Sequence, residues 1–295
     1  MFRRNMVLLT TLAFFVTCVI LDDYSVRCFG LGSEGRLGSG ATANIGDAAL
    51  RSVASSAAIG LGLRRTARAI AAGSAHTCAL LDDETVKCWG YNADGQLGLG
   101  GMDSRGDAAG EMGDSLAAID LGVGRTVQQI AVGGFHSCAL LDNNAVKCWG
   151  RNAAGQLGYG DTSNRGDAAN EMGSNLPAVQ FPTGRTARNI VAGANHTCAL
   201  LDDASVICWG ANDYGQLGQD STASIGDGVG ESVVSTPSIN LGTGRTALAL
   251  AAGDSHTCAI LDNYTVKCWG AGGNGRRAQS QQEPLIHVSC WTMLQ

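Results

Sequence analysis

Residues 73–100 read G-S-A-H-T-C-A-L-L-D-D-E-T-V-K-C-W-G-Y-N-A-D-G-Q-L-G-L-G, and altered copies of this stretch recur along the 295-residue chain. Each copy holds two cysteines, and equivalent cysteines such as Cys78 and Cys138 lie 60 residues apart. A fixed period of this length is typical of propellers and solenoids, whose units bury their cores against one another. We therefore expect one domain built from repeated units. The cysteine pairs are Cys18 and Cys28, Cys78 and Cys88, Cys138 and Cys148, Cys198 and Cys208, and Cys258 and Cys268.

The apolar pattern within each unit is that of short strands. Residues 76–81 are apolar on both faces, residues 82–84 interrupt the pattern, and residues 86–89 make a return strand, which together predict a β-hairpin. A further strand over residues 66–71 precedes the hairpin, and residues 116–121 are the best candidate for a fourth, edge strand. Four short strands repeated radially predict an all-β fold, a single β-propeller with four-stranded blades.

The N-terminal segment fits two interpretations. Two arginines precede the uncharged residues 6–20, which is the layout of a secretory signal, although the segment is short for a membrane span. The same segment overlies the first unit, because Cys18 aligns with Cys78 and Val16 stands where the other units have His. We expect residues 1–20 to be a signal or anchor that overlaps a truncated first unit, or else a buried strand. The propeller is expected over residues 8–278, followed by a non-repeat tail over residues 279–295.

Composition excludes several classes of function. The net charge is −6 and no long run of Lys or Arg occurs, which argues against nucleic-acid binding. No Gly-rich run has the context of a phosphate loop, so no nucleotide or other cofactor is expected. Regularly paired cysteines favour an oxidising compartment. A secreted or cell-surface protein is therefore expected, with the cytoplasm as the alternative, and no membrane contact is expected beyond the N-terminal segment.

Several motifs together resemble the repeat of the regulator of chromosome condensation family. They are A-A-G-x-x-H-T-C-A-L-L-D, V-K-C-W-G and N-x-x-G-Q-L-G, and the resemblance spans about residues 8–277. The Cys-bearing copies with R-G-D-x-x-x-E-M-G inserts look most similar to uncharacterised secreted or microbial relatives. The resemblance implies blades around a central channel, usually seven, whereas five hairpins occur here and the last copy decays to G-R-R-A at residues 275–278. Either five blades close a ring or the chain is a fragment of a longer ring. A closed ring predicts a monomer, because open blade edges promote aggregation.

The cysteines admit three interpretations. A three-residue bulged turn with Glu84 in the left-handed conformation would place Cys78 opposite Cys88, close enough for a disulfide, whereas a two-residue turn would separate the sulfurs. We favour the bulged turn and disulfides in all five pairs, with buried thiols as the alternative. A zinc site at His76 and the two cysteines would lack a fourth ligand. Nucleophilic catalysis needs one asymmetric site rather than a repeated one, so no catalytic or metal residue is predicted. The resemblance implies a structural His that bonds backbone near the Gly turn.

For function, the sequence favours a non-enzymatic binding platform. Variable loops on one face of a rigid ring would contact a protein or glycan partner. The resemblance implies the alternative, guanine-nucleotide exchange on a small Ran-type GTPase. The four tryptophans beside cysteines are expected to pack between blades, and the Arg-Gly-Asp tripeptides to form turns. The candidate binding residues are those that vary within the inserts: Asp103, Glu111, Asp161, Asn170, Asp220 and Glu231.

Overall fold

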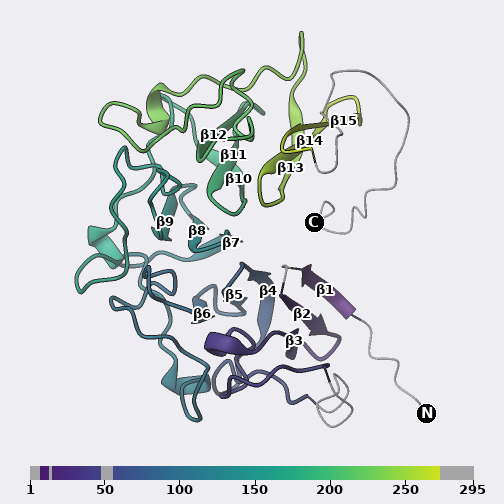
Figure 1. Ribbon diagram of the computed structural model, residues 1–295, viewed down its shortest axis with the longest axis vertical. Helices are drawn as coiled ribbons and strands as arrows, with labels where there is room; N and C mark the ends of the chain where they lie inside the picture. Colours follow the sequence, from purple (N-terminus) through teal and green to yellow (C-terminus); the bar gives the residue numbers. More distant parts are fainter. Residues whose placement is uncertain (1–6, 13–14, 48–55, 273–295) are drawn as a thin grey trace.

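The computed structural model describes residues 7–12, 15–47 and 56–272. Figure 1 shows five small sheets arranged side by side in an arc, which we call blades 1 to 5 in chain order. Each blade is an antiparallel sheet of three consecutive strands. The first strand of each blade lies toward the centre of the arc, and the long inserts that join the blades run along its outer rim (Figure 1).

The strands recur with nearly constant lengths. Blade 1 has β1 (Val7–Leu12), β2 (Val16–Leu21) and β3 (Val26–Gly30), and blade 2 has β4 (Ala67–Ala72), β5 (His76–Leu81) and β6 (Val86–Gly90). Blade 3 has β7 (Val127–Val132), β8 (His136–Leu141) and β9 (Val146–Gly150). Blade 4 has β10 (Ala187–Ala192), β11 (His196–Leu201) and β12 (Val206–Gly210), and blade 5 has β13 (Ala247–Ala252), β14 (His256–Leu261) and β15 (Val266–Gly270). Short 3₁₀ turns are η1 (Ser33–Gly35), η4 (Gly113–Ser115), η5 (Gly173–Asn175) and η6 (Val233–Ser235).

The hairpin turn has the predicted bulged form. The Leu81 N–H donates to Thr85 O at 2.9 Å, and the Glu84 N–H donates to Leu81 O at 3.1 Å. Glu84 adopts φ +65°, a left-handed conformation that costs a non-glycine residue about 1 kcal/mol. The resulting register places Cys78 directly opposite Cys88. The equivalent left-handed residues are Tyr24, Asn144, Ala204 and Tyr264.

The prediction of a fourth strand is wrong. Residues 116–121 form no ladder with β6; a single hydrogen bond, from Ile119 N–H to Val86 O at 2.8 Å, joins them to it. The buried side chains of the segment are Leu116, Ile119 and Leu121, whose spacing is not the alternation of a strand. The segment therefore covers the outer strand as an extended chain, and the described blades have three strands.

Among the described residues, the hydrophobic core consists of four clusters, each lying between two neighbouring blades. One side of a blade, which we call its trailing face, packs against the opposite side, or leading face, of the next blade. The loops before the middle strands add a ladder of backbone hydrogen bonds, since Gly134 accepts from Ser74 and donates to Ala194. Each blade thus depends on its neighbours. In blade 2 the trailing face is Cys78, Leu80, Val86, Cys88 and Leu97, and in blade 3 the leading face is Val127, Ile130, Ala139, Leu141 and Trp149.

The apolar N-terminal segment supplies β1 and β2 of blade 1. Val16, at the position of His in the other units, is 2% exposed and packs against blade 2. Cleavage of residues 1–20 as a signal stays a prediction. No helix among residues 7–12, 15–47 and 56–272 is both long and apolar enough to cross a membrane. The predicted tail, residues 279–295, lies outside the described residues.

Candidate partner-binding surface and the contacts that hold it

The cysteine pairs lie on the trailing faces of the blades. In blade 2 the Cα atoms of Cys78 and Cys88 are 4.1 Å apart and the sulfurs are at bonding distance, and the other four blades repeat this arrangement. The cysteines of blades 1 to 4 are at most 1% exposed, whereas Cys268 in blade 5 is exposed. Each pair joins two strands of one hairpin, and four of the five pairs lie inside a blade interface.

The repeated histidines bind the next blade rather than the nearby backbone. His76 Nε2 lies 2.8 Å from Ser137 Oγ in blade 3, and Ser137 Oγ donates to Gln96 O at 3.1 Å. The serine oxygen therefore accepts the Nε2 proton of His76. The predicted hydrogen bond from the ring to backbone at the Gly turn is wrong, because the ring packs against that turn instead. In blade 3, for example, the ring of His136 lies so close to Gly133 that a Cβ added there would be 2.2 Å from Cε1 of the His. Equivalent contacts join His136 to Thr197 and His196 to Thr257, both at 2.9 Å.

These histidines are unsuited to acid–base chemistry. Burial lowers the pKa of His76 to about 3, with a smaller contribution from Arg36, so the ring is neutral at physiological pH. His76 is 1% exposed and lies inside the interface between blades 2 and 3. Its place is therefore structural. The described residues also hold no group of three His, Cys, Asp or Glu side chains that could bind a metal ion.

The tryptophans complete the same interface. Trp149 is fully buried, and its Nε1–H donates to Gln96 O at 3.0 Å, the oxygen that also accepts from Ser137. The Gln-Leu-Gly turn of one blade thus receives two side-chain donors from the next blade. Trp209 repeats the contact with Gln156 at 2.9 Å. The predicted role of these aromatic side chains in blade packing is confirmed by this burial.

A buried asparagine fixes the start of each insert. Asn92 is 1% exposed, and its Nδ2 donates to Gly101 O at 2.7 Å and to Asp103 O at 3.1 Å. Its Oδ1 accepts from the Leu97 N–H at 2.9 Å. The backbone of residues 101–103 is thereby held while the side chains of Met102 and Asp103 point to solvent. Asn152 and Asn212 hold the two following inserts in the same way.

Glu111, a predicted binding residue, instead supports the loop around it. Its Oε2 accepts hydrogen bonds from three successive N–H groups, those of residues 106–108, at 2.9 to 3.2 Å. Burial would raise its pKa, but hydrogen bonds, led by that from Ala108, lower it below the ordinary value. Burial and a hydrogen bond to Glu111 raise the pKa of Asp107. The Arg-Gly-Asp turn is thus part of a carboxylate-capped loop, in which Gly106 adopts φ +89°.

The other predicted binding residues lie in three separate inserts. Asp161 is half-buried and pairs with Arg165 at 2.8 Å. Asn170 and Asp220 are exposed, with φ of +65° and +52°. Glu231 is also exposed, and its backbone N–H donates to Gly228 O at 3.0 Å. The six residues belong to three inserts, and the inserts run along the outer rim of the arc (Figure 1).

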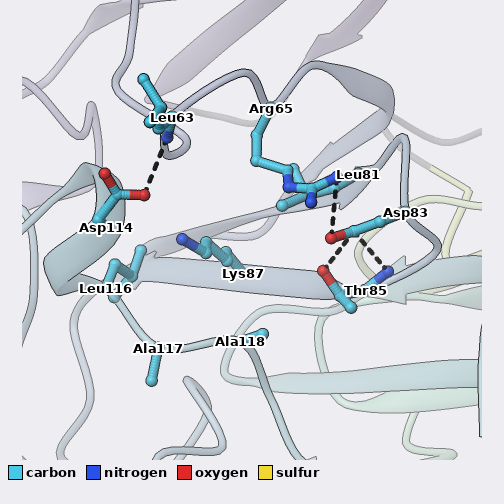
Figure 2. A pocket seen from close by; sticks show the side chains of 10 residues that line it. All are labelled: Leu63, Arg65, Leu81, Asp83, Thr85, Lys87, Asp114, Leu116, Ala117 and Ala118. Atoms are coloured by element: carbon cyan, nitrogen blue, oxygen red, sulfur yellow. Dashed lines mark hydrogen bonds and ion pairs between the residues drawn. The ribbon is translucent and has the colours of Figure 1, made fainter.

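Sequence reasoning missed one shallow hollow of about 380 Å³ beside the outer strand of blade 2. Figure 2 shows that Arg65 and Lys87 line it from different segments, together with Asp83. Arg65 pairs with Asp83 at 3.1 Å, and Lys87 Nζ donates to Gly113 O at 2.7 Å. The charged groups are already partnered, so the hollow offers little to a ligand. Its residues come from three stretches of chain, and no local motif marks them.

Comparison with known proteins identifies the repeat. The regulator of chromosome condensation (RCC1) repeat matches residues 67–96, 127–156, 187–216 and 248–276, and a second form of the same repeat matches residues 145–200 and 203–260. The probable E3 ubiquitin-protein ligase HERC4 of Homo sapiens is 32% identical over 208 residues, which cover 70% of this chain and 18% of the ligase. The human HERC3 ligase is 31% identical over 214 residues, covering 72% of this chain and 18% of that protein. The chain thus spans less than a fifth of the length of these relatives.

Solved structures show the same fold. Human WBSCR16 superposes with a TM-score of 0.67 at 21% identity, covering 90% of this chain and 62% of that one. Prp20p from Saccharomyces cerevisiae, studied with its binding to Gsp1p and histones, gives 0.64 at 20% identity and covers 88% and 56%. The ectodomain of the Physcomitrella patens receptor kinase CR4 gives 0.53 at 19% identity and covers 93% and 54%. At these identities the likeness is one of fold alone.

The relatives overturn the prediction that the protein is not an enzyme, because the curated proteins that it matches are named as ligases. The likeness is confined to the repeat region, and ligase activity is a property of those longer proteins. The predicted likeness to Cys-bearing secreted or microbial relatives stays a prediction. The matched repeats, their common register and the blade architecture show that this chain belongs to the regulator of chromosome condensation (RCC1) repeat family.

Proposed function

We propose that this protein is a platform that binds a protein partner through the starts of its inserts. We call residues 101–104, 161–164 and 221–224 the insert surface. One observation carries the proposal: the same buried asparagine holds the backbone of each segment, yet the side chains differ, reading G-M-D-S, D-T-S-N and S-T-A-S. A rigid backbone that presents variable side chains is the usual design of a binding surface.

Charge indicates the kind of partner. Residues 91–125, the insert after blade 2, contain six acidic side chains and two arginines, and the whole chain carries a net charge of −6. Opposite charges steer association and favour a complementary partner surface. A protein with a basic contact surface therefore fits the insert surface better than a neutral glycan does.

The cysteines bear on the compartment. Ten cysteines lie in five pairs at bonding distance, a pattern consistent with an extracellular protein. We propose a secreted or cell-surface location, in which the N-terminal segment is retained because it supplies β1 and β2 of blade 1. A location outside the cell argues against guanine-nucleotide exchange on a Ran-type GTPase, which is therefore the second candidate function. The shared fold with Prp20p supports that candidate.

Histones are a defined basic probe for the test. Binding of the full chain to purified histones would be measured by biolayer interferometry at low and at high salt. Asp103→Arg reverses a charge on the insert surface, and Asp22→Arg makes the same change at the exposed hairpin tip of blade 1. We expect binding that weakens with salt and weakens about tenfold in Asp103→Arg, while Asp22→Arg retains affinity.

Two results would contradict the proposal. One is no binding to any histone, and the other is equal loss of affinity in both variants, which would indicate a response to net charge alone. Release of labelled guanine nucleotide from a Ran-type GTPase, measured in parallel, tests the second candidate. Accelerated release by the wild-type chain would place exchange ahead of simple binding.

A further inference from the structure

The trailing face of blade 5 has no partner among the described residues. In blades 2 to 4 every residue of the middle strand is buried, whereas in β14 His256 is exposed and Cys258 and Ile260 are half-buried. Val266 is 55% exposed, although its equivalent Val86 is 1% exposed. These side chains form the surface that receives the next blade elsewhere in the arc.

The leading face of blade 1, at the other end of the arc, is also only partly buried. Thr17, Val19 and Phe29 are only half-buried, while their neighbours Val16 and Cys18 on the trailing side are at most 2% exposed. The corresponding leading-face residues of blade 2 are fully buried against blade 1: Thr77, Ala79 and Trp89 are each 0% exposed. The arc therefore ends in one unpartnered face of each kind.

The internal interfaces show what these two faces bind. In each internal interface the trailing face supplies a His and apolar side chains, and the leading face opposite supplies a hydroxyl and apolar side chains. Between blades 4 and 5, for example, His196 Nε2 lies 2.9 Å from Thr257 Oγ1. Blade 5 retains the His, as His256, and blade 1 retains the hydroxyl, as Thr17. Phe29 stands at the position of the buried tryptophans. The two end faces thus carry the His, the hydroxyl and most of the apolar side chains of such an interface, with Phe29 in place of the tryptophan.

Within one chain, blades 1 and 5 stand at opposite ends of the arc and are not packed together (Figure 1). We propose that two copies of this chain associate head to tail, with the trailing face of blade 5 in one copy against the leading face of blade 1 in the other. Such a contact is heterologous, because it joins two different surfaces of identical subunits. It replaces the expectation of a monomer, which rested on a closed ring.

The test uses the full chain and two variants that each block one face. Val266→Asp places a charge on the trailing face, and Val19→Asp places one on the leading face. Light scattering coupled to size exclusion, over a range of concentrations, is expected to show assemblies larger than the 30.3 kDa chain for the wild type and monomers for each variant alone. Because each variant keeps one intact face, an equimolar mixture should form a dimer and nothing larger.

Controls keep the result interpretable. Leu248→Asp makes the same kind of change at a half-exposed residue of blade 5 outside the trailing face and should assemble like the wild type. Circular dichroism checks the fold of each variant, and Thr17→Lys, at a half-buried residue of the same face, replaces Val19→Asp if the latter does not fold. A wild type that is monomeric at every concentration would overturn the proposal, as would a mixture of the two variants that stays monomeric. A Val266→Asp variant that still dimerises alone would also overturn it.

Discussion

His136 Nε2 lies 2.9 Å from Thr197 Oγ1 across the boundary between blades 3 and 4. Thr197 in turn donates to Gln156 O. One hydroxyl of blade 4 therefore bonds both the His of blade 3 and the turn that follows blade 3. The contact recurs at the boundaries on either side. Because each blade shares buried polar contacts and core with its neighbours, its stability depends on theirs.

Removing one of these histidines tests that coupling. His136→Ala leaves a buried space and removes one hydrogen bond, so we expect the free energy of unfolding to fall by about 1–3 kcal/mol. His256→Ala is the matched control, because His256 is exposed on the trailing face of blade 5, and its loss should change stability by less than about 0.5 kcal/mol. Urea denaturation of dilute protein measures both. Equal losses would show that the interface contact contributes nothing.

The buried histidines also predict a loss of stability in mild acid. Burial lowers the pKa of His76 and His136 to about 3 and that of His196 to about 4. In the unfolded chain a histidine takes up a proton below about pH 6.5, whereas the buried rings stay neutral. The contribution of the buried histidines to the free energy of unfolding is therefore complete above about pH 6.5 and is lost as pH falls toward their pKa values in the folded protein. At pH 5 each buried histidine should lower the free energy of unfolding by about 2 kcal/mol relative to pH 7.

Urea denaturation at pH 7 and pH 5 measures this dependence. His136→Gln should remove roughly one third of the histidine contribution, since one of the three groups is gone. Leu157→Ala, which destabilises the fully buried core without altering a histidine, should keep the full pH dependence. A wild-type stability that does not change between the two pH values would contradict the buried, neutral state of these rings.

A pair of glycines tests the packing of each insert on the preceding blade. Gly95 adopts φ +77°, and a Cβ there would lie 2.3 Å from Asp167 N in the next insert. Gly215 is equivalent, with φ +78°, but none of the described residues lies within 4 Å of its Cβ position. Gly215→Ala should cost about 1 kcal/mol for the backbone conformation alone.

Gly95→Ala should cost more, because backbone atoms must move as well, and amide exchange around Asp167 should become faster. Denaturation combined with hydrogen exchange distinguishes the two variants. If Gly95→Ala and Gly215→Ala lost the same stability and kept the same exchange protection, the insert would not rest on the turn.

The cysteine pairs should differ in their resistance to reduction. Cys268 is exposed, while Cys88, Cys148 and Cys208 are fully buried between blades. Thiol attack requires access to a sulfur, so a mild reductant should open the Cys258–Cys268 pair first in the native protein. Alkylation followed by peptide mass spectrometry reports the order. Simultaneous reduction of all five pairs would mean that the blade interfaces do not shield the sulfurs.

The blade register could be predicted from sequence because its signals are local. Residues 76–81 are apolar on both faces, so the register depends on the turn: the three-residue bulged turn favoured from the sequence places Cys78 opposite Cys88, as the structure has them. The prediction of a fourth strand is wrong because Leu116, Ile119 and Leu121 lack the alternation of a strand. Buried positions spaced by three residues and then by two distinguish this extended segment from a strand.

Contacts between blades could not be predicted from local sequence patterns. His76 and Ser137 are 61 residues apart, and only the recurrence of Thr or Ser after each His hints at the contact. The sequence predicts Glu111 as a variable binding residue, yet acidic residues recur at its equivalents, Glu171 and Glu231. A residue that repeats in three of the four inserts, with Arg51 at the position in the first, is better assigned to the loop framework, as the hydrogen bonds of Glu111 to residues 106–108 show.

Tryptic peptide mapping under non-reducing conditions, on protein exported from cells, tests most directly whether each hairpin is closed by its own disulfide. Trypsin cleaves after Arg27, Lys87, Lys147 and Lys267, between the two cysteines of four blades, while blade 4 has Ile207 there. Disulfides within hairpins predict that those four pairs of peptides stay linked until reduction and that the blade 4 cysteines form a loop within one peptide. Free thiols at these ten cysteines, or links between different blades, would contradict the disulfide-closed propeller.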